Sequence, residues 1–119
     1  GKADAPAEEY DPSGEYRPYI VSREHWSVPM LNFISEQGDH QAFDYNHLYR
    51  AAFNPSGTIT LIFTEHEVTI RGRQLRELHQ RLIFHRVTFI CAADSATKKL
   101  LDGVPVVTAI DIQLRKPAL

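Results

Sequence analysis

The clearest hydrophobic pattern in the chain is a pair of apolar alternations between Thr58 and Ile70. Apolar residues fall on one side of two successive extended stretches: Ile59, Leu61 and Phe63 in the first, Val68 and Ile70 in the second. A period of two is typical of strands with one buried face. With a turn near Glu65 and His66, this segment predicts an antiparallel hairpin, and Gly72 is expected to end its second strand.

From Arg73 the period changes to that of a helix. Three leucines recur on one side at about 100° per residue: Leu75, Leu78 and Leu82. So short a helix is not stable alone, so the leucines must pack against other elements. We predict a helix over Arg73–Ile83, followed by a strand over Val87–Cys91.

Turn signals extend this core in both directions. Asn54-Pro55-Ser56-Gly57 has the residues that a type I turn favours at its first, second and fourth positions. It joins an alternating stretch, Phe43–Phe53, to the strand at Thr58, which predicts a meander of three strands. Before it, we expect extended segments in Glu15–Ser22 and Met30–Ser35.

The end of the chain predicts one more helix and one more strand. Asp94 or Ser95 can cap a short helix through Leu101, which Gly103 would stop. From Val104 to Leu114 every second residue is apolar, apart from Thr108. Pro105 places the start of this strand at an edge or outside the hydrogen-bonded ladder.

Together these elements predict an α+β fold: an antiparallel sheet of five or six strands with one main helix, about Arg73–Ile83, packed on one face. The 119 residues suffice for one domain with its own core. Residues 1–15 are rich in Ala, Pro and acidic side chains and are predicted to form an acidic N-terminal arm, which leaves 16–119 as the single domain.

Charge is distributed unevenly along the chain. Up to Asp44 there are three basic and nine acidic residues, and after it ten basic and six acidic ones. Five arginines concentrate around the predicted helix: Arg71, Arg73, Arg76, Arg81 and Arg86. They are the candidates for binding a nucleic acid or another polyanion. The plainer interpretation is a solvated helix face, because the overall pI of about 6.3 is far below that of a dedicated DNA-binding domain.

Catalytic and metal-binding signatures are weak. The six histidines show no established ligand spacing, and the single cysteine excludes an internal disulfide. Cys91 lies in an apolar strand, where a free cysteine usually behaves as a small buried hydrophobe. We expect no metal and no cofactor. A small enzyme that uses His47 or Cys91 is the weakest functional hypothesis.

The leading hypothesis is a non-enzymatic module that binds a protein or another ligand and self-associates. Aromatic residues and arginine are enriched at protein interfaces, and strand edges in a small sheet need covering. The interface candidates are Phe84, Tyr16 and Tyr19. We therefore expect a homo-oligomer, with a nucleic acid or an acidic protein as the alternative partner. No apolar run is long enough to span a membrane. A cytoplasmic location is expected, with secretion after removal of a signal peptide left open.

Overall fold

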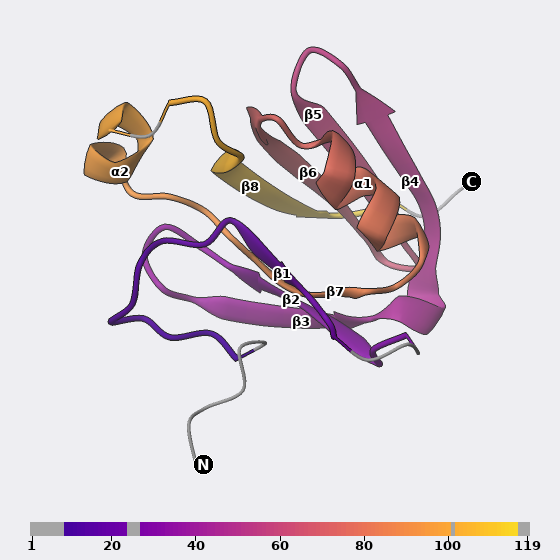
Figure 1. Ribbon diagram of the computed structural model, residues 1–119. Helices are drawn as coiled ribbons and strands as arrows, with labels where there is room; N and C mark the ends of the chain where they lie inside the picture. The colour runs from indigo at the N-terminus through magenta and orange to yellow at the C-terminus, as the bar shows by residue number, and fades with distance from the viewer. Residues whose placement is uncertain (1–8, 24–26, 101, 117–119) are drawn as a thin grey trace, which may run out of the picture.

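The computed structural model describes residues 9–23, 27–100 and 102–116, and it is an α+β fold that consists mostly of sheet (Figure 1). The described residues form two sheets of four strands each, so the predicted single sheet of five or six strands is wrong. The first sheet has the order β1-β7-β2-β3 and the second has the order β4-β5-β6-β8. The strands of the first sheet are β1 (Tyr19–Val21), β2 (Met30–Ile34), β3 (His40–Asp44) and β7 (Val87–Cys91). Those of the second are β4 (Leu48–Asn54), β5 (Thr58–Phe63), β6 (His66–Arg73) and β8 (Val106–Leu114).

The second sheet contains the predicted meander. β4, β5 and β6 pair antiparallel in sequence order, and β8 returns to pair antiparallel with β6. The predicted turn before β5 is confirmed, since the N–H of Gly57 donates to the carbonyl of Asn54 at 2.9 Å. β5 alternates strictly between buried and half-buried residues, as an antiparallel sheet with one wet face requires.

Gly72 does not end β6, contrary to the prediction. The strand runs through it to Arg73, with an irregularity in its pairing with β8 between Arg71 and Gly72. A Cβ at Gly72 would come within 2.0 Å of the carbonyl oxygen of Val106, so only glycine allows this close approach. The predicted helix start at Arg73 is therefore wrong as well. Gln74 follows the strand with a φ of 57°, and helix α1 spans Arg76–Ile83.

The chain crosses from the first sheet to the second between β3 and β4. The expected alternating stretch Phe43–Phe53 is broken there by a 3-10 helix, η1 (Tyr45–His47), whose first turn Asp44 caps by accepting from the N–H of Asn46 at 2.8 Å. The reason is Tyr45, which is buried and donates its hydroxyl to the carbonyl of Val87 at 2.6 Å. Burying this side chain turns the backbone out of the strand.

The first sheet is buried on both faces over much of its area. β2 runs parallel to β7 and antiparallel to β3. One face joins the main core with the second sheet and α1, while Tyr10 and Tyr16 pack on the other. Parallel strands are usually covered on both sides in this way.

Helix α1 lies beside β4 of the second sheet and near β7 of the first (Figure 1). Its three leucines are fully buried in the main core, as the helical stripe predicted: Leu75, Leu78 and Leu82. Helix α2 (Ser95–Leu100) is capped by Asp94, which accepts from the N–H of Thr97 at 2.7 Å. The predicted end of that helix, Leu101, and the first eight residues of the predicted acidic arm lie outside the described residues. No helix in the described part has the length and apolar character needed to cross a membrane.

Candidate functional site

The second sheet has two outer strands, and the edge of β4 is covered by helix α1. The ring Nε2 of His79 donates to the carbonyl oxygen of Ala51 at 2.8 Å. The ring of Phe53 stacks against His79 at 5.6 Å between centroids, and the guanidinium of Arg76 lies 5.2 Å from the same ring. At this edge the carbonyl of Ala51 and the ring of Phe53 are therefore in contact with α1.

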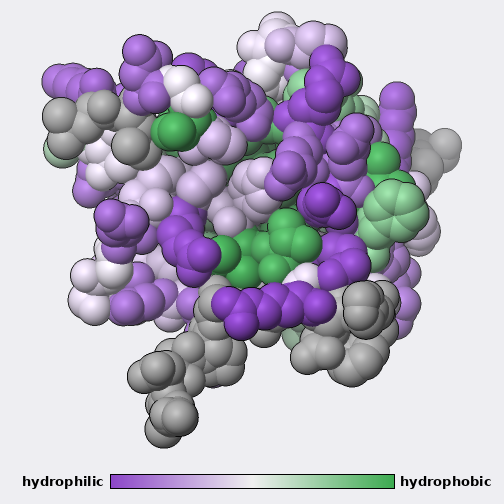
Figure 2. All heavy atoms as spheres, in the orientation of Figure 1, coloured by the Kyte–Doolittle hydropathy of each residue, from purple (hydrophilic) through white to green (hydrophobic). Residues whose placement is uncertain are grey.

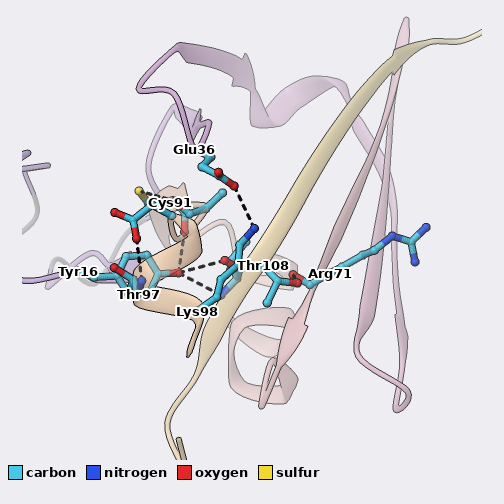
Figure 3. A network of polar contacts seen from close by, with 10 residues as sticks. Tyr16, Glu36, Arg71, Cys91, Thr97, Lys98 and Thr108 are labelled. Carbon is cyan, nitrogen blue, oxygen red and sulfur yellow. Dashed lines mark hydrogen bonds and ion pairs between the residues drawn. The ribbon is translucent and has the colours of Figure 1, made fainter. Parts of the chain in front are cut away.

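Among the described residues, the opposite edge, along β8, is covered only at its beginning. Val107 donates its N–H to the hydroxyl of Tyr16 at 3.0 Å and accepts from the N–H of Ala93 at 2.9 Å. The Tyr16 hydroxyl in turn donates to the carbonyl of Cys91 at 2.8 Å, which Figure 3 shows at the centre of the network. Tyr16 thus joins the end of β7 in one sheet to the start of β8 in the other.

The Tyr16 hydroxyl remains protonated over a wide pH range. Burial raises its pKa well above the usual value, although the hydrogen bond from the Val107 backbone acts in the opposite direction. A neutral phenol can donate and accept at the same time, as this contact requires. The link is therefore structural and not that of an acid or base ready for catalysis.

From Thr108 to Leu114 the described residues supply backbone hydrogen bonds to β8 only from β6. Along this segment Ile110 and Ile112 are half-buried against the main core. Leu114 ends the same series with 75% of its surface exposed. On the other side of the strand, Gln113 donates to the carboxylate of Asp111 at 3.0 and 3.2 Å. We call Thr108–Leu114 the open edge.

The outer strands of the first sheet are less suited to pairing with another strand. β1 has three residues and follows Pro18, which has no backbone donor. β3 has five residues, of which three are exposed and polar or small, and it is flanked by Asp39 and Asp44. Short edges with charges nearby are a common protection against strand pairing. β8 is longer, with nine residues, and Asp111 is the only charged residue within it, although Arg115 and Lys116 follow it directly.

A cavity of about 560 Å³ lies between residues 9–17, the end of β2 and the segment after β7. Carboxylates dominate its charged lining: Glu9, Asp11, Glu15, Glu36 and Asp94, against Arg17 alone. Three of these have partners, because Glu36 pairs with Lys98 at 2.9 Å (Figure 3), Asp94 caps α2, and Asp11 accepts from the N–H and hydroxyl of Ser13 at 3.0 and 2.8 Å. Within the described residues, no three His, Cys, Asp or Glu side chains come together as metal ligands.

Cys91 lines this cavity but is only 6% exposed, and burial raises the pKa of its thiol. A protonated, buried thiol is a poor nucleophile. His47, the other residue of the enzyme hypothesis, does not line the cavity and bonds through Nδ1 to the hydroxyl of Thr64 at 2.9 Å. The structure gives these two residues separate surroundings.

The five candidate arginines are spread over several elements. Arg76 lies over Phe53, Arg86 donates to the carbonyl of Ser22, and Arg73 donates to the carbonyl of Lys98 at 3.3 Å. Arg71 and Arg81 are exposed, and the Arg71 side chain points away from the Tyr16 network in Figure 3. Polyanion binding through these residues stays a prediction.

The three interface candidates have different surroundings. Phe84 follows the last turn of α1 and is 70% exposed, whereas Tyr16 is held by the contacts described above. Tyr19 donates to the carboxylate of Glu77 at 3.3 Å and borders a groove with Pro18, Val21 and Val104. On the face of the molecule turned toward the viewer, Figure 2 shows apolar surface near the middle, between β1 and α1.

Sequence reasoning did not single out the open edge. The alternation of β8 and its position after Pro105 were visible, but not which strands would flank it. Comparisons with protein families, with curated proteins and with solved structures found no match to this chain.

Proposed function

We propose that this protein is an interaction module that binds an extended polypeptide segment along the open edge of β8. The observation that carries the proposal is the row of backbone groups from Thr108 to Leu114 that have no hydrogen-bond partner on the side away from β6 among the described residues. An edge of this kind is the template for strand addition, in which main-chain hydrogen bonds supply affinity.

The side chains of the open edge suit an added strand. Ile110, Ile112 and Leu114 follow one another on one face, and Leu114 is largely uncovered. Residues directly opposite each other on paired strands contact one another, so apolar residues of an incoming strand would cover this row. Each main-chain hydrogen bond contributes a net of about 0.5–1.5 kcal/mol. Because association costs several kcal/mol, we expect modest affinity.

The residues that line the cavity favour binding over catalysis as the function of the protein. Its only thiol is buried and has a raised pKa, and no histidine lines it. A general base or an activated nucleophile needs a pKa near the working pH. The enzyme hypothesis therefore ranks below the interaction hypothesis.

A labelled synthetic peptide with the sequence of residues 106–116 provides the test. Fluorescence anisotropy measures its binding to the protein, and amide hydrogen exchange measures protection in β8. The control peptides carry N-methyl groups on alternate amides, in two series that together cover both edges of the peptide. We expect the unmodified peptide to bind and to slow exchange within Thr108–Leu114, and at least one methylated series to lose binding. Absence of binding and of protection would overturn the proposal.

A further inference from the structure

We infer that the strand that pairs with the open edge is β8 of a second copy of this chain, antiparallel and related by a twofold axis midway between the two copies of Ile112. This inference rests on the proposed function, because it names the occupant of the same edge.

A twofold axis perpendicular to the sheet keeps each face of the sheet on the same side in both copies. The axis must therefore lie midway between the two copies of one residue, and residues equally far on either side of that residue come to lie opposite each other. An axis at Ile110 would put Gln113 of the second copy opposite Val107. The N–H and carbonyl of Val107 are already bonded to Tyr16 and Ala93, so no strand can pair there.

The neighbouring axes are also unfavourable. An axis at Asp111 places two carboxylates directly opposite each other, which is destabilising. An axis at Gln113 pairs only Ile112 to Leu114 within the strands. This axis also places Asp111 of one copy opposite Arg115 of the other. The Arg115 guanidinium, however, already donates to the carbonyl of Phe63 at 3.1 Å, and the backbone N–H of Arg115 donates to the carbonyl of Glu65.

The axis at Ile112 has none of these defects. It pairs Ile110 to Leu114 of each copy, which leaves the covered start of β8 free of the interface. On the apolar face Ile112 meets Ile112 of the second copy, and Ile110 meets Leu114, so the most exposed leucine of the strand becomes covered.

The polar face is complementary in the same register. Asp111 of one copy lies opposite Gln113 of the other, twice by symmetry. Within one chain the Gln113 amide already donates to the Asp111 carboxylate, so both groups lie on the same side of the strand. The same donor and acceptor can bond across the axis. This register therefore gives Asp111, the only charged residue of β8, a hydrogen-bond donor on the second copy.

Two substitutions of opposite charge at Gln113 test the register, because they should change the dimer dissociation constant in opposite directions. Gln113→Lys places an ammonium opposite Asp111 of the second copy, and Gln113→Glu places a carboxylate there. With two such pairs per dimer, the dissociation constant from sedimentation velocity should fall roughly 2- to 30-fold in the first variant and rise by a similar factor in the second. Gln113 also lies opposite Glu67 on β6, so the free energy of unfolding is measured alongside.

Asp111→Asn is the matched background, since it removes the charge across the axis and leaves Glu67 in place. There the two charge variants should change dimerisation little, because the coupling is between 111 and 113. Equal effects of both variants with and without Asp111 would overturn the register. A chain that stays monomeric at millimolar concentration overturns self-pairing; if the peptide of residues 106–116 still protects β8, the proposed function stands, and if it does not, both fail.

Discussion

β4 and β8 are the two outer strands of the same sheet, and each pairs antiparallel with a single neighbour. The outer sides of these two strands have different surroundings. At β4, His79 of helix α1 bonds to the backbone of Ala51, and Phe53 packs against the same helix. At β8, Tyr16 and Ala93 occupy Val107, and the strand beyond it has only β6 as a partner among the described residues.

The difference teaches that an edge is closed by what the chain places beside it and not by its own composition. β4 and β8 both carry apolar residues and few charges. Natural sheets protect long edges by covering or by charge. Beyond the start of β8, no described residue outside β6 bonds to its backbone, and Asp111 is the only charged residue within the strand. An edge left open in this way is a surface that can bind.

The largest expected effect comes from loosening the helix that covers β4. Leu78→Ala removes a fully buried side chain from the core between α1 and the sheets. The free energy of unfolding, from urea denaturation, should fall by about 2–5 kcal/mol. Gln80→Ala on the exposed side of α1 is the control and should change stability by less than about 0.5 kcal/mol. Equal losses in both variants would contradict the packing described for α1.

Tyr16→Phe should extend the open edge to the start of β8. It removes the donor to Cys91 and the acceptor for the N–H of Val107, both in a partly buried contact. We expect a loss of about 1–3 kcal/mol in unfolding free energy. Amide exchange at Val107 should become faster while exchange in β4 keeps its relative protection. An unchanged Val107 rate would show that the hydroxyl does not cover this edge.

His79→Phe should partly open the edge of β4. The substitution keeps an aromatic ring near Phe53 but removes the hydrogen bond to the carbonyl of Ala51. A loss of about 0.5–1.5 kcal/mol in unfolding free energy follows from one neutral hydrogen bond. Because the carbonyl has no exchangeable proton, isotope-edited infrared spectroscopy of labelled Ala51 is the direct measurement. A carbonyl band identical to that of the wild type would argue against the contact.

Tyr19 makes the attachment of α1 sensitive to high pH. Burial first, and the charge of Glu77 second, raise the pKa of Tyr19 to about 12. Its pKa in the unfolded chain is near 10. In the folded state Tyr19 therefore stays protonated to a higher pH than in the unfolded state. The resulting contribution of Tyr19 to the free energy of unfolding is complete below pH 10 and is lost as the pH rises from 10 to about 12. Tyr19→Phe should make the decline in unfolding free energy over this range shallower; an identical pH profile would contradict the shift.

The smallest effect on stability is expected at the end of the open edge. Leu114→Lys replaces a side chain that is 75% exposed, so unfolding free energy should change by less than about 0.5 kcal/mol. A lysine at an edge opposes strand pairing, so binding of the peptide of residues 106–116 should weaken. Lys116→Leu, just beyond the strand, is the reciprocal variant and should not weaken it. If Leu114→Lys binds the peptide as tightly as the wild type, the edge is not the binding surface.

Much of the local structure was predictable because its causes are local. The alternation around Leu61 and the Asn54–Gly57 turn correctly predicted the β5–β6 hairpin and the turn before it, and the leucine stripe correctly predicted the buried face of α1. Two elements were mispredicted where a distant contact overrides the local pattern. Gly72 stays in β6 because the backbone of Val106 lies against it, and Tyr45 breaks the strand pattern because its hydroxyl reaches Val87.

The sequence by itself determined which residues of β5, β6 and α1 face inward, since the periods of strands and helices depend only on neighbouring residues. The tertiary structure alone decided the division into two sheets and the presence of a helix at one edge and not at the other. Those features arise from pairings between segments far apart in the chain, such as β2 with β7 and β6 with β8, which leave no periodic signal in either segment. The open edge belongs to this second group because it is defined by the neighbours that β8 has and by those that it lacks among the described residues.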